Sequence, residues 1–312
     1  MSPDTGSHPT STRSLRSLGI AELTAGLKGD PGWRQLPLVS ERALRQLLRD
    51  PVLLLAVIAQ PVFLGLLVVL TQYDVVKPFP ILFFAVVIAT WLGLNNSARD
   101  LVRERRQYVR DRLTGLRPFA YLGAKTLVHA LLGLAQIAVL LIILHVGCSL
   151  VLDRPVYQDL RSVSLERLMC VLLLSYLGGV GLGFLASILV RTEEAAVAML
   201  PMLIIPQLLL SAVAAGVQTE PYTKPRPFRP LVVTLMSQQD MPKSAVLVDL
   251  LSIGCFSRPA ALVAEAPPVN HFGSWIWLGD FCHLLILLLG TWILVVLAFQ
   301  ISEPRWLRLI GL

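Results

Sequence analysis

Long apolar runs alternate with short charged stretches along the chain. Each run holds about 20 apolar residues, which is enough for a helix to cross a hydrocarbon core of ~30 Å. The predicted spans lie at about 51–71, 79–96, 118–147, 168–190, 195–216 and 276–300. In lipid the backbone polar groups must bond within the segment, so each run is expected to be helical. The pattern therefore predicts an all-α membrane protein with six transmembrane helices.

An amphipathic segment precedes the first predicted span. Between residues 38 and 50 the leucines recur at helical spacing, while Arg42, Arg45 and Arg49 occupy another face. This pattern is typical of a helix that lies on the membrane surface and leads into a span.

A second amphipathic segment, residues 97–117, follows the second span. Apolar residues at helical spacing separate seven arginines and three acids, which predicts a cytoplasmic surface helix. The charged residues are Arg99, Asp100, Arg103, Glu104, Arg105, Arg106, Arg110, Asp111, Arg112 and Arg117. One interpretation is an anchor that binds lipid phosphates. The interspersed acids and the apolar stripe favour a surface that docks on another protein, and Glu104 would then need a basic or amide partner there or on the helix of residues 38–50.

The remaining polar regions define the domain boundaries. Residues 1–36 are rich in Ser, Thr, Gly and Pro, which predicts a disordered tail or linker before a membrane domain at 37–312. A long Pro-rich outer loop is expected at about 217–275. Within it, residues 243–254 are apolar but too short to span, which favours a re-entrant or interfacial helix.

Composition and charge agree with a membrane protein. The chain is 55% hydrophobic and only 15% charged, and its mean hydropathy is +0.68, values that exclude an ordinary soluble domain. Six spans with the N-terminus inside place 18 of the 27 Lys and Arg on the cytoplasmic side. The net charge of +7 thus indicates topology, with both termini cytoplasmic, and we do not expect nucleic-acid binding.

Candidate chemistry is sparse. The sequence has no phosphate-binding loop of the GxxxxGK[ST] type, no GxSxG and no HExxH, so we expect no catalytic residues, no metal and no cofactor on this chain. Polar residues inside the predicted spans either hold helices together or line a substrate path. The candidates for the path are Gln60, Asn95, Asn96 and Gln207.

Two stretches resemble the membrane domains of G-subfamily ABC transporters and their bacterial type-2 exporter relatives. Residues 91–136, which contain NNSARDLVRERRQYVRDRL, are similar to a small-residue turn followed by the family's Arg-rich coupling helix. Residues 182–213, with Pro201 and Pro206, resemble the connection between the fourth and fifth spans. The resemblance extends from about Arg42 to the C-terminus. It departs from the family where Ser211 is followed by Ala instead of Gly, and where the outer loop has a single cysteine, Cys255.

The resemblance implies a permease in the bacterial inner membrane that exports a lipid, amphiphile or other substrate from the cytoplasm or inner leaflet. ATP and Mg would bind to a separate nucleotide-binding subunit or domain. Two membrane domains, either identical or related halves, would form a dimer in contact with membrane lipid. Arg42, Arg45 and Arg49 would belong to a connecting helix. The coupling helix, which rests on the ATPase, would contribute Arg99, Asp100, Arg103, Glu104, Arg105 and Arg112.

A different class of function also fits the residues. A membrane scaffold or sensor subunit would bind a cytoplasmic partner through the same Arg-rich helix and transport nothing. Copurification with an ATPase would separate the two hypotheses.

Overall fold

The computed structural model describes residues 32–49, 51–71, 79–151, 165–216 and 271–308. All regular elements in these ranges are helical. A short 3-10 helix, η1 (Gly32–Arg34), precedes α2 (Leu36–Leu48), α3 (Pro51–Thr71), α4 (Phe79–Ser97), α5 (Asp100–Leu113), α6 (Pro118–Val151), α8 (Leu165–Leu189), α9 (Glu193–Gly216) and α13 (His271–Arg308). The all-helical class is therefore confirmed for the described part of the chain.

Four helical stretches among the described residues each contain an apolar segment long enough to cross a membrane. They are Leu54–Thr71, Ile81–Leu113, Pro118–Leu150 and Leu168–Leu189, the second of which includes α5. Helices α9 and α13 occupy the positions of the fifth and sixth predicted spans, and α13 contains a shorter apolar stretch, Leu288–Pro304. Six spans in total remain a prediction.

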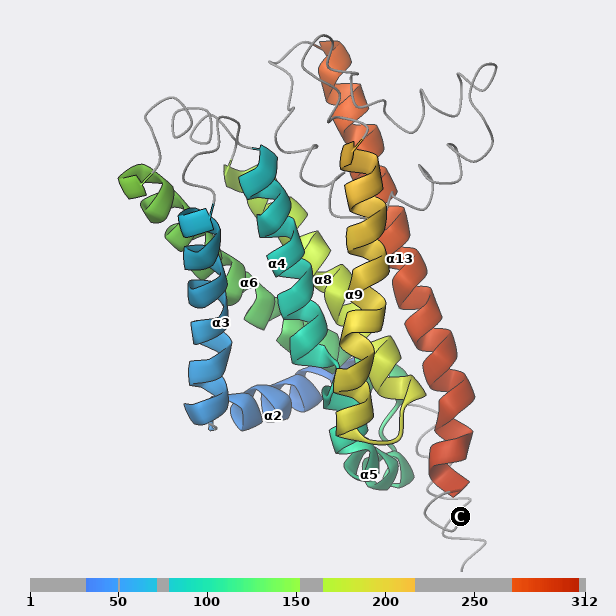
Figure 1. Cartoon of the computed structure of the whole chain (residues 1–312). Helices are drawn as coiled ribbons and strands as arrows, with labels where there is room; N and C mark the ends of the chain where they lie inside the picture. Colours follow the sequence, from blue (N-terminus) through green and yellow to red (C-terminus); the bar gives the residue numbers. More distant parts are fainter. Residues whose placement is uncertain (1–31, 50, 72–78, 152–164, 217–270, 309–312) are drawn as a thin grey trace, which may run out of the picture.

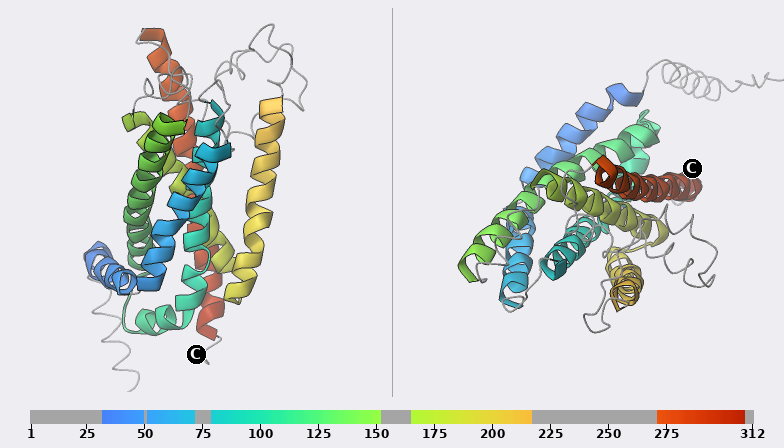
Figure 2. Two further views of the ribbon diagram at one scale, coloured as in Figure 1. Left: turned by 60° about the vertical axis from the view of Figure 1, so that its left-hand side comes forward. Right: turned by 90° about the horizontal axis from the view of Figure 1, so that it is seen from above.

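Helices α4 and α8 lie side by side at the centre of the bundle (Figures 1 and 2). Glycines make this close approach possible because they bring no Cβ between the two backbones. A Cβ built on Gly93 would lie 2.1 Å from the carbonyl oxygen of Tyr176, and one on Gly179 would lie 2.2 Å from that of Thr90. No side chain larger than hydrogen fits at these two positions without a backbone shift.

The outer surface of the bundle is apolar. Large hydrophobic side chains are exposed along several helices, as expected where the surrounding solvent is lipid and not water. Examples are Leu55, Phe63, Leu70, Ile142, Met202, Leu289 and Ile293.

The two amphipathic segments form helices at the same end of the bundle. In Figure 1, α2 lies across the direction of the membrane-spanning helices and α5 lies beneath α4 and α9, near the C-terminal end of α13. The short connection between α8 and α9, residues 190–192, is at this end too. Most of the charge of the described residues is thus collected in one layer.

Several predictions fall outside the described residues. These are nearly all of the N-terminal tail at 1–36, the outer loop up to residue 270, and the short apolar segment at 243–254.

Candidate functional site

Helix α5 has one exposed, strongly basic side. Three exposed arginines of α5 and the one that precedes it follow the helical repeat, at intervals of four, three and four residues. We call them the arginine stripe: Arg99, Arg103, Arg106 and Arg110. None of the four makes an ion pair with another described residue. The opposite side of α5 is buried against the bundle through Leu101, Val102, Tyr108 and Val109.

The two acids near the start of α5 point into the bundle, toward α6. The ammonium group of Lys125 lies 3.2 Å from a carboxylate oxygen of Asp100 and 2.7 Å from Oε1 of Glu104. His129, one turn further along α6, places Nε2 3.1 Å from Asp100 Oδ2. We call these four residues the acid–lysine cluster. The hydroxyl of Tyr121 also donates to Glu104, at 3.5 Å.

Burial makes the acid–lysine cluster interdependent. Only 7% of the Lys125 side chain is exposed. Its charge has lost most of its hydration and is compensated by the two carboxylates, whose charges it compensates in turn. For Asp100, which begins α5 beyond the predicted spans, burial raises the pKa. The hydrogen bond to His129 and the charge of Lys125 outweigh this and lower the pKa to about 2. Asp100 therefore stays ionised far below neutral pH, and its contacts with Lys125 and His129 hold α5 on α6.

A second attachment joins α5 to the end of α8. The backbone N–H of Val102 donates to Ser187 Oγ at 2.8 Å. The guanidinium of Arg105 donates to the carbonyl oxygens of Ser187 at 3.2 Å and Val190 at 2.7 Å. A cation at the C-terminal end of a helix bonds the carbonyls that have no partner within the helix and complements the helix dipole. Arg105 thus caps α8, which ends at Leu189.

The contact between α5 and α2 is more exposed. Arg42 donates to Asp111 Oδ2 at 3.0 Å, and 57% of the Arg42 side chain is accessible to solvent. Just before α2, the side chain of Gln35 donates to the carbonyl of Gly115 at 3.3 Å and accepts from the N–H of Arg117 at 3.1 Å. Gly115 has a φ of 107°, a conformation that suits glycine, so this turn between α5 and α6 depends on it.

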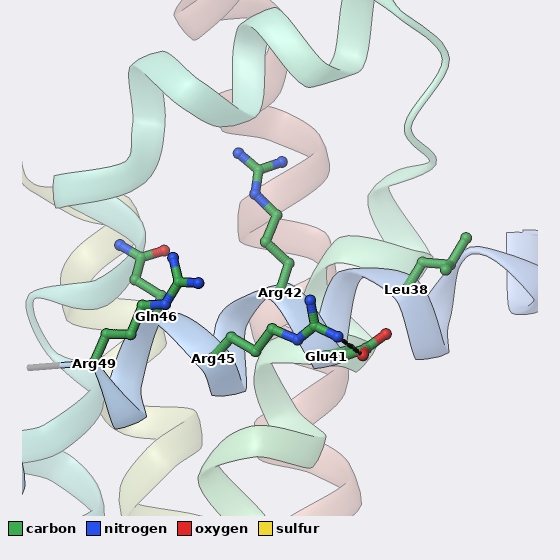
Figure 3. Close-up of a pocket in the computed structure, with 6 residues that line it drawn as sticks. All are labelled: Leu38, Glu41, Arg42, Arg45, Gln46 and Arg49. Atoms are coloured by element: carbon green, nitrogen blue, oxygen red, sulfur yellow. Dashed lines mark hydrogen bonds and ion pairs between the residues drawn. The ribbon is translucent and has the colours of Figure 1, made fainter.

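The outer face of α2 carries the other predicted basic residues. A hollow of about 440 Å³ is lined by Leu38, Glu41, Arg42, Arg45, Gln46 and Arg49 (Figure 3). Arg45 pairs with Glu41 on the same helix. A second hollow, of about 310 Å³, lies between α2 and α5 and reaches Glu104 and Lys125.

The six residues predicted for the ATPase interface therefore divide into two groups. Arg99 and Arg103 are exposed on the arginine stripe. The other four, which are Asp100, Glu104, Arg105 and Arg112, bond to residues of this chain. The partner of Glu104 is Lys125 on α6 and not an arginine of α2. Contact of any of the six with an ATPase stays a prediction.

The predicted path residues lie among the packed spans. Pro61 has no N–H to bond the carbonyl of Val57 one turn earlier, and the side chain of Gln136 donates to that carbonyl at 2.8 Å instead. Asn96 in turn donates to Gln136 Oε1 at 2.7 Å. This chain of bonds joins α3, α6 and α4, so Asn96 holds helices together.

The contacts of the other three candidates for the substrate path do not indicate a role for them. Gln60 has a buried Oε1 without a hydrogen-bond partner among the described residues. Asn95 is half-buried on α4. Gln207 belongs to α9, but its side chain lies outside the described residues. A role for any of them in transport remains a prediction.

Sequence reasoning missed most of the partners that hold α5. Lys125 and His129 are four residues apart inside a predicted span, so they lie on one face of the helix. Two ionisable groups are unfavourable in lipid unless they are paired, so this spacing could have indicated acidic partners. Ser187 and Glu303 have no comparable pattern around them. In the part of the chain that the structure describes, no group of three His, Cys, Asp or Glu is arranged to hold a metal ion.

Comparison with known proteins gives one finding. A family model described as ABC-2 type transporter matches residues 34–224, from η1 past the end of α9. No curated protein matches the chain.

Proposed function

The chain belongs to the family of ABC-2 type transporters, and we propose that it is the permease subunit of an ATP-driven exporter. Domains of this family are the multi-pass membrane part of type-2 ABC transporters and work with ATP-binding subunits. The observation that carries the proposal further is the arginine stripe of α5. It is exposed and has no ion-pair partner among the described residues, although the opposite side of the helix is buried against the bundle.

This arrangement suits a surface that receives a partner. Arginine offers five donors in a planar fork and is favoured where carboxylates are recognised at interfaces. Four arginines on one face would match an acidic or carbonyl-rich surface of an ATP-binding subunit, which would hold the ATP and Mg. Closure of two such subunits around ATP would favour one position of α5 and so one conformation of the bundle.

Orientation follows from the same charges in this proposal. The end of the bundle that carries α2, α5 and the residue 190–192 connection faces the cytoplasm, in keeping with the preference of Lys and Arg for that side. Both termini would then be cytoplasmic, in a bacterial inner membrane. Two permease domains would form a dimer, and the apolar outer surface suits a lipid or amphiphile that enters from the bilayer.

The test is the effect of the arginine stripe on a partner. We expect Arg103→Glu combined with Arg106→Glu to reduce copurification of an ATP-binding subunit by at least about tenfold, because like charges placed opposite each other at an interface cost several kcal/mol. The tagged chain would be purified in mild detergent, and the subunit that carries a phosphate-binding loop would be quantified by mass spectrometry. Arg103→Lys with Arg106→Lys keeps the charge and serves as control.

Other outcomes separate the alternatives. Undiminished copurification in the double glutamate variant would contradict docking on the stripe. Undiminished copurification, together with weaker binding of α5 to anionic lipid in the double glutamate variant, would favour a lipid anchor.

A further inference from the structure

Helix α13 is longer than a membrane span needs. It comprises 38 residues, His271–Arg308, which at 1.5 Å per residue give ~57 Å, against ~30 Å for the hydrocarbon core. Its C-terminal turns lie next to α5 (Figure 1). The predicted span ended at residue 300, and the helical turns beyond it were not predicted.

Four buried aromatic rings join this end of α13 to α5 and α6. The ring centroid of Tyr108 lies 4.6 Å from that of Tyr121 and 5.2 Å from that of Phe299. Trp306 packs edge-on against both Phe299, at 5.3 Å, and Tyr108, at 6.1 Å. Such aromatic pairs contribute more stabilisation than the burial of their apolar surface alone would give.

A carboxylate from α13 completes the contact. Oε1 of Glu303 accepts hydrogen bonds from Arg112 Nε at 2.7 Å and from the Tyr108 hydroxyl at 2.9 Å. Only 14% of the Glu303 side chain is exposed. Burial, together with the negative charge of Glu303, raises the pKa of Tyr108 well above its usual value, so the hydroxyl keeps the proton that it donates.

Trp306 also meets the residue that caps α8. The guanidinium of Arg105 lies over the Trp306 ring, 4.5 Å from its centroid, while it donates to the carbonyls of Ser187 and Val190. A cation over the face of an indole is attracted by the ring. Arg105 therefore links α5, the end of α8 and the end of α13 at one point.

We propose that the last turns of α13 are a clasp, formed by Phe299, Glu303 and Trp306, that sets the position of α5 and transmits its displacement to the last predicted span. The contacts on this side are buried, whereas the Arg42–Asp111 contact with α2 is exposed, and exposed ion pairs contribute little. Helix α5 is thus firmly joined to α8 and α13 and more weakly joined to α2.

The inference rests on the proposed function in one respect only, namely that an ATP-binding subunit is what displaces α5. A partner that pushes the arginine stripe would act directly on α13. The clasp itself belongs to the chain alone, so it can be tested without an ATP-binding subunit.

Hydrogen exchange in the purified full-length chain in detergent tests the clasp. We expect the backbone amides of α5 to exchange at least about tenfold faster in Glu303→Gln and in Trp306→Ala than in the wild type, while the exchange of α3 amides stays unchanged. Glu166→Gln and Trp33→Ala, which alter an acid and an indole that are both exposed, are the matched controls and should behave as the wild type.

Exchanging the two charged residues of the Glu303–Arg112 pair distinguishes a specific role in positioning α5 from a general loss of stability. The combination Glu303→Arg with Arg112→Glu restores an opposite pair, so α5 protection should return toward the wild-type level, above that of either single variant. Wild-type exchange of α5 in Glu303→Gln and Trp306→Ala would overturn the proposal. Equal acceleration of α3 and α5, or no recovery in the exchanged pair, would overturn it as well. Failure to find an ATP-binding partner would contradict the proposed function and leave this result standing.

Discussion

Replacing Gly179 with alanine is expected to disrupt the packing of α4 on α8, whereas the same change at the adjacent Gly178 should leave the protein folded. An added Cβ at Gly179 would lie 2.2 Å from the carbonyl oxygen of Thr90 and 3.0 Å from the backbone nitrogen of Leu94. Both neighbours are backbone atoms, so no side-chain rotation relieves the clash. Nothing lies within 4 Å of the corresponding position at Gly178.

The expected cost for Gly179→Ala is at the upper end of the range for overpacked interiors, about 3 kcal/mol. Membrane-protein yield and thermal unfolding in detergent would measure it, with Gly178→Ala as the control at the neighbouring residue. Equal stability of the two variants would show that α4 and α8 do not cross at Gly179 as described.

Replacing Lys125 with methionine should release α5 from α6. The change keeps an unbranched side chain of similar length but leaves the largely buried carboxylates of Asp100 and Glu104 without their cation. Removing one member of a buried charge pair typically costs about 3–5 kcal/mol, because the remaining charge has lost its hydration and its partner. We expect a lower unfolding temperature and faster hydrogen exchange in α5.

A triple variant provides the control for this prediction. Lys125→Met combined with Asp100→Asn and Glu104→Gln has no uncompensated charge, and neutral replacement of a whole buried ion group is often tolerated. The triple variant should therefore be more stable than Lys125→Met alone. If Lys125→Met is as stable as the wild type, the cluster does not hold α5.

The parts of the fold that sequence reasoning predicted are those set by local composition. Helix α3 begins at Pro51 and ends at Thr71, and α4 begins at Phe79, all as predicted, because an apolar run in lipid must satisfy its own backbone hydrogen bonds. The amphipathic helices α2 and α5 were predicted for a similar reason, since their two faces are encoded at the helical repeat.

The contacts of α5 were harder to predict because they join residues distant in sequence. Glu303 and Arg112 are separated by 191 positions, and no periodic pattern connects them. The acids of α5 were interpreted as part of an outward surface, yet Asp100 and Glu104 face Lys125. A charged residue at the boundary between the polar and apolar faces of an amphipathic helix can point either to solvent or to a buried partner. Only the tertiary structure shows which residues point to a partner.

We propose that this chain is a permease whose energy comes from an ATP-binding subunit docked on the arginine stripe. Steady-state ATP hydrolysis measures it most directly, in three matched preparations: the purified chain alone, its complex with the copurifying subunit, and the same subunit mixed with the Arg103→Glu, Arg106→Glu variant. The chain alone should show no turnover, because its sequence has no loop that could hold the phosphates. The wild-type complex should hydrolyse ATP faster than the mixture with the variant. Turnover by the isolated chain after contaminants are removed, or equal rates with the wild type and the variant, would contradict the account.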